Sequence, residues 1–157
     1  MNALNFAPID RVAILCRADD LMDSPELPIL THVVPCGFPS PAEDHADERL
    51  DIVRRLVKHP ASTYFAHAQG DSMVKAGILS GAILVIDRSL HAQHGDVVLA
   101  AVGDEFTCKR LYVRNDQFRL VPESDDKRFN AITPGEGDEV AIWGVVTAAV
   151  NEYRRGH

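Results

Sequence analysis

The 157-residue chain has little of what several common protein classes require. Its three cysteines, Cys16, Cys36 and Cys108, are odd in number and widely spaced. They form neither a disulfide framework nor a C-x-x-C metal pair, so we expect reduced thiols. No apolar run approaches the roughly 20 residues that a membrane span needs, and the first residues lack the basic flank and apolar stretch of a secretory signal. These absences predict a cytoplasmic protein with no role at a membrane.

Positive charge is also in short supply, since the formal net charge is −7. A protein that binds nucleic acid by itself normally has a basic patch and a high isoelectric point. We therefore expect no direct nucleic-acid binding, and a partner would hold this protein near DNA. The histidines show no H-E-x-x-H or other metal-binding spacing, so we expect neither a metal nor a cofactor.

Proline is abundant only at the start of the chain, where residues 1–41 hold six of the nine prolines. The run VVPCGFPSP at 33–41 excludes a regular helix, because each proline removes a backbone donor and fixes φ. Only 11–17 looks periodic, and it is too short for a stable helix on its own. We predict a flexible, extended N-terminal arm over 1–41 that docks elsewhere, followed by a compact domain over 42–157.

The compact part is predicted to begin with one helix and to continue as strands. Ser40, Pro41 and Glu43 fit the N-cap, the first helical position and the capping box of a helix. Pro60 would end that helix. Beyond it, short runs separated by turn signals predict an antiparallel β domain, either a sandwich or a partly rolled barrel. The predicted strands are STYFAHAQ, AILVID, DVVLAAV, EFTCKRLYV, QFRLVP and VAIWGVVTAAV.

Lys109 lies within EFTCKRLYV, where alternation places it on one face with Thr107 and Leu111. Both faces of that strand are mixed, so the pattern leaves open whether Lys109 is buried or reaches solvent at a sheet edge. Burial disfavours the charged form of an amine, and a neutral lysine can act as a general base.

Ser72 follows Gly70-Asp71 at the end of a predicted strand. A serine there either forms an ordinary turn or projects its hydroxyl near unpaired backbone N–H groups, which can form an oxyanion site. Serine is a weak nucleophile until a base takes its proton, and a Ser-Lys pair is one known solution.

The order of three motifs is informative: Cys36-Gly37, then GDSM at 70–73, then FTCKRL at 106–111. Together with CGFPSPA, HPASTYF, HGDVVLAAV and WGVV, this combination resembles the LexA-type family of self-cleaving serine peptidases. Within that family it is similar to the accessory subunits of error-prone DNA polymerases. The resemblance covers 33–150 and implies a mostly β fold, an antiparallel β peptidase domain with an extended N-terminal arm and a short helix.

The resemblance also implies a mechanism based on a Ser-Lys dyad. Lys109 would take the proton of Ser72, and Ser72 would attack the carbonyl carbon of Cys36. The backbone N–H groups of Ser72 and Asp71 would bind the oxyanion. Gly37 would supply the leaving amine.

The partners that the resemblance implies are a second copy of the chain in a homodimer, a RecA filament on single-stranded DNA that stimulates cleavage, and the catalytic subunit of an error-prone DNA polymerase. These belong to translesion synthesis in the SOS response to DNA damage. Two alternatives stay open. One is a LexA-type or phage-type repressor-like autopeptidase, which the short arm and the acidic charge disfavour. The other is a non-catalytic dimeric adaptor in which Cys36-Gly37 is only a loop.

Overall fold

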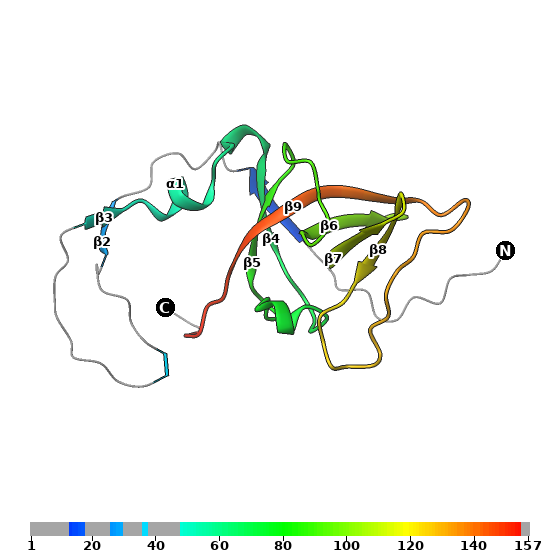
Figure 1. Ribbon diagram of the computed structural model, residues 1–157. Coiled ribbons are helices and arrows are strands. Elements are labelled where there is room, and N and C mark those ends of the chain that lie inside the picture. Colours follow the sequence, from blue (N-terminus) through cyan, green and yellow to red (C-terminus); the bar gives the residue numbers. More distant parts are fainter. Residues whose placement is uncertain (1–12, 18–25, 30–35, 38–47, 155–157) are drawn as a thin grey trace.

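A computed structural model describes residues 13–17, 26–29, 36–37 and 48–154 (Figure 1). The described chain is mostly β with one short α-helix, as the sequence predicted. In chain order, its helix and strands are β1 (Ala13–Arg17), β2 (Leu27–Ile29), β3 (Glu48–Leu50), α1 (Ile52–Leu56), β4 (Thr63–His67), β5 (Ile83–Asp87), β6 (Val97–Val102), β7 (Glu105–Arg114), β8 (Gln117–Val121) and β9 (Val140–Val150). Two single-turn 3-10 helices complete them, η2 (Pro60–Ser62) and η3 (Val74–Ala76). All six strands predicted after the helix are confirmed.

Seven of the strands form one antiparallel sheet in the order β1-β4-β5-β9-β6-β7-β8. The long strand β9 lies in the middle of this order. Its first half pairs with β6 and its second half with β5, and Figure 1 shows it running across the length of the sheet. β9 therefore joins the β4–β5 side of the domain to the β6–β8 side. β2 and β3 pair separately as a two-stranded sheet.

Two irregularities in β9 bend this central strand. Trp143 is the extra residue where β9 pairs with β6, and Thr147 is the extra residue where it pairs with β5. An extra residue in one strand of a pair bends that strand and increases its local twist. The two bulges thus allow one continuous strand to serve both halves of a curved sheet.

A tight turn fixes the register of β7. Asn115 (φ 51°) and Asp116 (φ 59°) join β7 to β8, and Arg114 pairs with Gln117 across the turn. Two successive residues with positive φ are typical of a type I′ hairpin turn, and Asn and Asp tolerate that conformation. Because a slip of one residue would move every side chain to the other face, this turn also decides which face Lys109 occupies.

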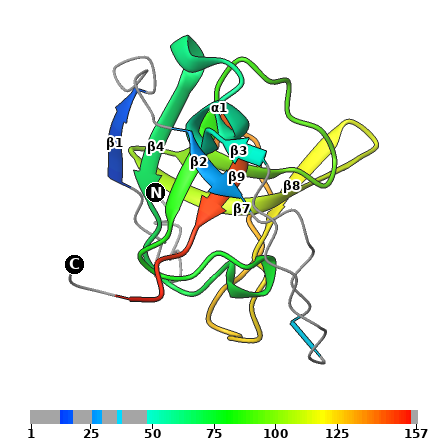
Figure 2. The same ribbon diagram turned by 90° about the vertical axis from the view of Figure 1, so that its left-hand side faces the viewer.

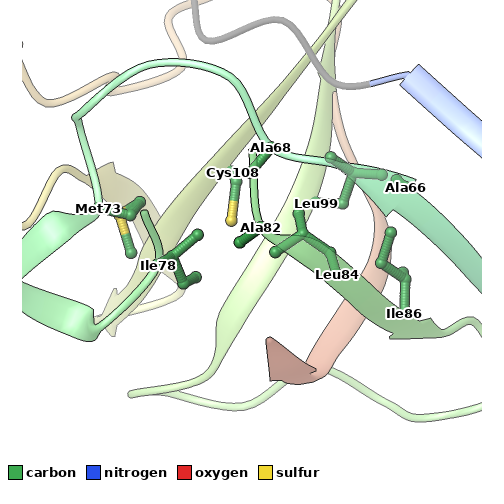
Figure 3. Close-up of a cluster of buried hydrophobic side chains, with 9 residues drawn as sticks. All are labelled: Ala66, Ala68, Met73, Ile78, Ala82, Leu84, Ile86, Leu99 and Cys108. Atoms are coloured by element: carbon green, nitrogen blue, oxygen red, sulfur yellow. The ribbon is translucent and has the colours of Figure 1, made fainter. Parts of the chain in front are cut away.

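Two hydrophobic clusters cover the two faces of β6 and β7. Leu99 of β6 belongs to the first cluster, whereas its neighbours Val98 and Ala100 belong to the second. This alternation is what a strand buried on both faces produces. The first cluster, drawn in Figure 3, consists of Ala66, Ala68, Met73, Ile78, Ala82, Leu84, Ile86, Leu99 and Cys108. The second consists of Val98, Ala100, Leu111 and Leu120. A side chain near the middle of β7 is therefore buried whichever face it occupies.

The predicted helix was wrong over part of its length. Glu48–Leu50 are the strand β3, paired with Leu27–Ile29, and the helix α1 begins only at Ile52. The side chain of Asp51 caps it by accepting a hydrogen bond from the Arg54 N–H at 2.9 Å. Pairing with β2 supplies backbone partners that outweigh the local helix signals. The predicted N-cap at Ser40 lies outside the described residues.

Part of the predicted arm is built into the domain. Ala13–Arg17 form β1 at the edge of the large sheet, where they pair with β4. In this segment the chain is extended and pairs with the chain's own sheet, whereas the sequence suggested an arm that docks on something else. The remainder of 1–41, apart from 26–29 and 36–37, lies outside the described residues.

Gly144 of β9 gives a test of how closely the central strands pack. A Cβ at this position would lie 2.7 Å from Ile86 Cγ2 and 3.4 Å from the Asp87 carbonyl oxygen. We expect Gly144→Ala to lower the free energy of unfolding by about 1–3 kcal/mol, the usual cost of overpacking. Chemical denaturation would measure it, with Ala141→Ser at an exposed position of β9 as the control. Equal denaturation midpoints for the two variants would contradict this expectation and would show that β9 can move to accommodate the added methyl group without loss of stability.

Candidate functional site

Lys109 is buried in the middle of β7, which answers the question that the sequence left open. Its exposed fraction is 5%, and Thr107 and Leu111 on the same face are buried as well. Its cross-strand partner on β6 is Val98, which is fully buried. An amine in this position has lost most of its contact with water and needs acceptors from the protein.

Among the described residues, three oxygen atoms lie within hydrogen-bonding distance of the Lys109 amine. Nζ lies 2.8 Å from Ser72 Oγ, 2.9 Å from Thr107 Oγ1 and 3.0 Å from the carbonyl oxygen of Cys108. As an ammonium group, Nζ donates to all three oxygens. As a neutral amine, it can donate to two and accept a hydrogen bond from the third. The structure thus brings together two predicted residues, Ser72 and Lys109, at a distance suited to proton transfer.

Ser72 lies in the loop between β4 and η3, and its side chain has no exposed surface. The next residue, Met73, belongs to the first hydrophobic cluster, and so does Cys108, the neighbour of Lys109. Figure 3 shows both side chains within this cluster. Gly70, with φ 97°, lets the chain turn into the loop. Apolar packing therefore fixes the backbone beside each member of the Ser72–Lys109 pair.

Glu123, which follows β8, also holds the Ser72 loop in place. Its N–H donates to the carbonyl oxygen of Ser72 at 2.7 Å, and its own carbonyl oxygen accepts from the Lys75 N–H at 2.9 Å. Arg110 of β7 donates to both carboxylate oxygens of Glu123, at 2.7 and 3.1 Å. These hydrogen bonds lower the pKa of the Glu123 carboxyl below its ordinary value, against the opposing effect of partial burial. β7 thus provides both the lysine and, through Arg110, an anchor for the serine loop.

The backbone N–H groups of Asp71 and Ser72 are the ones that the family resemblance assigned to an oxyanion site. Within 13–17, 26–29, 36–37 and 48–154, neither group donates a hydrogen bond. Both groups are close in sequence to the Ser72 hydroxyl. Donors at such a position can stabilise the negative charge that develops when a hydroxyl attacks a carbonyl carbon.

Cys36 and Gly37, the predicted cleavage site, lie elsewhere. Both residues are exposed, and a Cβ on Gly37 would have no atom of the described residues within 4 Å, its chain neighbours aside. The short segment that they form stands apart from the large sheet in both views (Figures 1 and 2). The structure therefore brings Ser72 and Lys109 together but does not bring the Cys36–Gly37 bond to them.

Thr107, Arg110 and Glu123 contact the pair or its loop, and the sequence assigned none of them a role in the site. Strand alternation did place Thr107 on the same face as Lys109, two residues before it, but did not show that its hydroxyl contacts the amine. No comparable signal exists for Glu123, whose place beside Ser72 depends on the path of the chain after β8.

Other polar groups in the described part of the chain do not extend this site. No histidine there hydrogen-bonds to Ser72; His59 Nδ1 instead lies 2.6 Å from Asp87 Oδ2, and His94 Nδ1 accepts from the Val113 N–H. That part of the chain contains no group of three or more side chains arranged to bind a metal. None of its helices has the length and apolar character needed to cross a membrane.

Comparison with known proteins gives consistent results. A family model described as peptidase S24-like matches residues 28–147. The chain is 40% identical to Protein ImpA of Escherichia coli over 132 residues, which cover 84% of this chain and 88% of the relative. It is 39% identical to Protein MucA of Escherichia coli over 127 residues, covering 81% and 86%. It is also 37% identical to LexA repressor 1 of Geobacter sulfurreducens over 135 residues, covering 86% of this chain and 64% of the repressor.

The contact between Arg110 and Glu123 predicts a pH-dependent contribution to stability. Because the pKa of Glu123 is lowered in the folded protein, this contribution is complete above the ordinary value of 4.5 and is lost as the pH falls through the folded value. We expect Glu123→Gln to lower the free energy of unfolding by about 1 kcal/mol at neutral pH. The difference from the parent should shrink on acidification.

Urea denaturation at a series of pH values would measure this difference. Glu136→Gln, at an exposed position, is the matched control and should change stability little at any pH. A difference between Glu123→Gln and the parent that stays constant on acidification would contradict the assignment.

Proposed function

The chain belongs to the peptidase S24-like family, and on this premise we propose that it is a self-cleaving serine peptidase that cuts its own Cys36–Gly37 bond. The observation that supports this most directly is the 2.8 Å contact between Lys109 Nζ and Ser72 Oγ in a buried site. Lysine is almost never fully buried unless it is paired with another group. A serine beside a buried lysine has the base that it needs to act as a nucleophile.

In the proposed mechanism, Lys109 starts as a neutral amine and accepts the proton of Ser72. The two N–H groups of the neutral amine donate hydrogen bonds to Thr107 Oγ1 and the Cys108 carbonyl oxygen. This orients the lone pair of Lys109 Nζ toward the Ser72 hydroxyl. Ser72 Oγ then attacks the carbonyl carbon of Cys36 and forms a tetrahedral intermediate. The N–H groups of Ser72 and Asp71 stabilise the negative charge on the former carbonyl oxygen.

The intermediate collapses when the bond from carbon to the Gly37 nitrogen breaks. Lys109, now an ammonium group, gives its proton to that nitrogen, and Cys36 is left as an ester on Ser72. Water, deprotonated by Lys109, adds to the ester carbon. The bond from that carbon to Ser72 Oγ then breaks, Lys109 returns the proton to Ser72 Oγ, and Cys36 leaves as a carboxylate. Gly37 suits the position after the cut bond because the absence of a Cβ lets the backbone come close to the nucleophile.

Cleavage by this route requires the arm to move. Cys36 and Gly37 are exposed and lie apart from the large sheet, whereas Ser72 is buried. An extended, proline-containing segment is suited to entering a peptidase site by pairing with it as a strand. We infer that a RecA filament on single-stranded DNA stimulates cleavage by favouring this entry.

The cellular role that we propose follows the resemblance to UmuD, an accessory subunit of an error-prone DNA polymerase. The cleaved chain would act as a homodimer with the catalytic subunit of such a polymerase in translesion synthesis during the SOS response. The net charge of −7 agrees with recruitment to DNA through partners. Burying a lysine costs free energy, and a non-catalytic adaptor gives no functional reason for a buried lysine in contact with a buried serine. We therefore favour the peptidase.

Two substitutions test the proposed dyad. Ser72→Ala removes the nucleophile and Lys109→Ala removes the base, so each should abolish the fragment that begins at Gly37. Mass spectrometry of purified protein incubated at alkaline pH, where the parent should cleave faster, would detect this fragment. Lys127→Ala, at an exposed position, is the matched lysine control and should cleave like the parent.

Circular dichroism and thermal unfolding would establish that Ser72→Ala retains the fold. Continued production of the Gly37 fragment by folded Ser72→Ala, with no other protease present, would exclude the dyad. A parent protein that stays intact at alkaline pH, even with a RecA filament, would instead favour the non-catalytic adaptor.

Thr107 offers a finer test, because its hydroxyl hydrogen-bonds to the proposed base and not to the proposed nucleophile. Thr107→Val removes the acceptor 2.9 Å from Lys109 Nζ with little change in volume. We expect self-cleavage to slow by about tenfold, which corresponds to the loss of one hydrogen bond of about 1.4 kcal/mol. Thr107→Ser keeps the hydroxyl and should restore the rate measured by gel densitometry. Equal rates for the valine and serine variants would show that this hydroxyl does not position the amine.

A further inference from the structure

The outer edge of β4 is occupied by a strand from the N-terminal arm. β1 pairs with β4 in antiparallel register, from Ala13 opposite His67 to Arg17 opposite Tyr64. β4 pairs with β5 along its other side, so removal of β1 would leave β4 as the edge strand of the sheet. An edge strand presents a row of backbone N–H and C=O groups that another extended chain can pair with.

A cut at Cys36–Gly37 would divide both pairs of strands that connect the arm to the domain. β1 and β2 precede this bond, whereas β3 and β4 follow it. β2 pairs with β3, and Arg49 adds a hydrogen bond to the carbonyl oxygen of Glu26 at 2.6 Å. The fragment that ends at Cys36 would therefore be held only non-covalently, by contacts that include the β1–β4 and β2–β3 pairings and the Arg49 hydrogen bond.

We propose that the outer edge of β4 is a strand-binding site whose occupant is the segment Ala13–Arg17, held within the chain before cleavage and bound reversibly after it. Before the cut, the chain connection keeps β1 at an effective concentration on the order of millimolar. After the cut, occupancy depends on the concentration of the fragment, so dilution vacates the edge. Cleavage thus converts a permanent edge strand into a dissociable ligand.

The regulatory meaning of this site rests on the proposed self-cleavage, but the binding of β1 to β4 does not. The consequence would be a release in two steps, in which the bond is cut first and the β4 edge is vacated second. The register of β1 on β4 identifies the ligand by its chemistry: an extended backbone that pairs antiparallel with residues 64–67.

The first experiment uses the uncut full-length protein with Ser72→Ala, so that self-cleavage has no influence. Ile14→Pro together with Cys16→Pro removes two backbone donors from β1 and forces φ away from strand values. Hydrogen exchange in the 63–67 segment should then lose protection. A matched pair, Ala3→Pro with Asn5→Pro, introduces the same two prolines before β1 and should leave the exchange of 63–67 unchanged. Unaltered protection in the Ile14/Cys16 variant would overturn the proposal.

The second experiment cuts the chain independently of Ser72. In the same Ser72→Ala protein, residues 31–35 are replaced by the recognition sequence of a site-specific protease, which then severs the arm between β2 and β3. Protection of 63–67 should persist at high protein concentration, fall on dilution, and return on addition of a synthetic peptide with the sequence RVAILCRAD. Protection that is lost on dilution and not restored by millimolar peptide would refute a strand-binding site. Neither result depends on whether the parent protein cleaves itself.

Discussion

A buried amine is the constraint on which the rest of this structure depends. Lys109 has almost no contact with solvent, so its Nζ must find oxygen acceptors in the protein. β7 itself supplies two of them, from Thr107 and Cys108. The third, Ser72, comes from a loop far away in the sequence. Closing that loop on β7 satisfies the amine and creates the serine–lysine contact in one step, so the requirement of stability and the proposed chemistry coincide.

Ordinary packing provides the accuracy that such a contact needs. Met73 and Cys108, the immediate neighbours of the pair, lie in one hydrophobic cluster, and close-packed interiors leave side chains little freedom. Glu123 adds a polar restraint, since its backbone pairs with the serine loop while Arg110 holds its carboxylate. The serine–lysine pair is therefore held by apolar packing on one side and by the Glu123 hydrogen bonds on the other. β7 takes part in both, through Cys108 and Arg110.

Local patterns in the sequence predicted much of the sheet but not the details of the site. The strands from β4 to β9 were recognisable because turn signals separate short runs, and Asn115-Asp116 adopts the conformation that a tight hairpin requires. The direction of Lys109 was not predictable, since β6 and β7 are buried on both faces and alternation cannot separate core from solvent. The helix signals before Leu50 were overridden by pairing with β2. The place of Glu123 beside Ser72 is a property of the assembled chain and has no local signature.

The serine–lysine pair is assembled in this structure, but the bond that we propose it cuts lies elsewhere. The contact between Ser72 and Lys109 is already formed at 2.8 Å, whereas the Cys36–Gly37 bond is exposed and lies apart from the large sheet. Under the proposed function, the slow step would then be entry of the arm rather than assembly of the nucleophile and base. β1 and β2, which precede that bond, are held by their pairing with β4 and β3. These pairings restrict how far the chain that carries the bond can move. A partner that acts on the arm could therefore control cleavage without altering any atom of the serine–lysine pair.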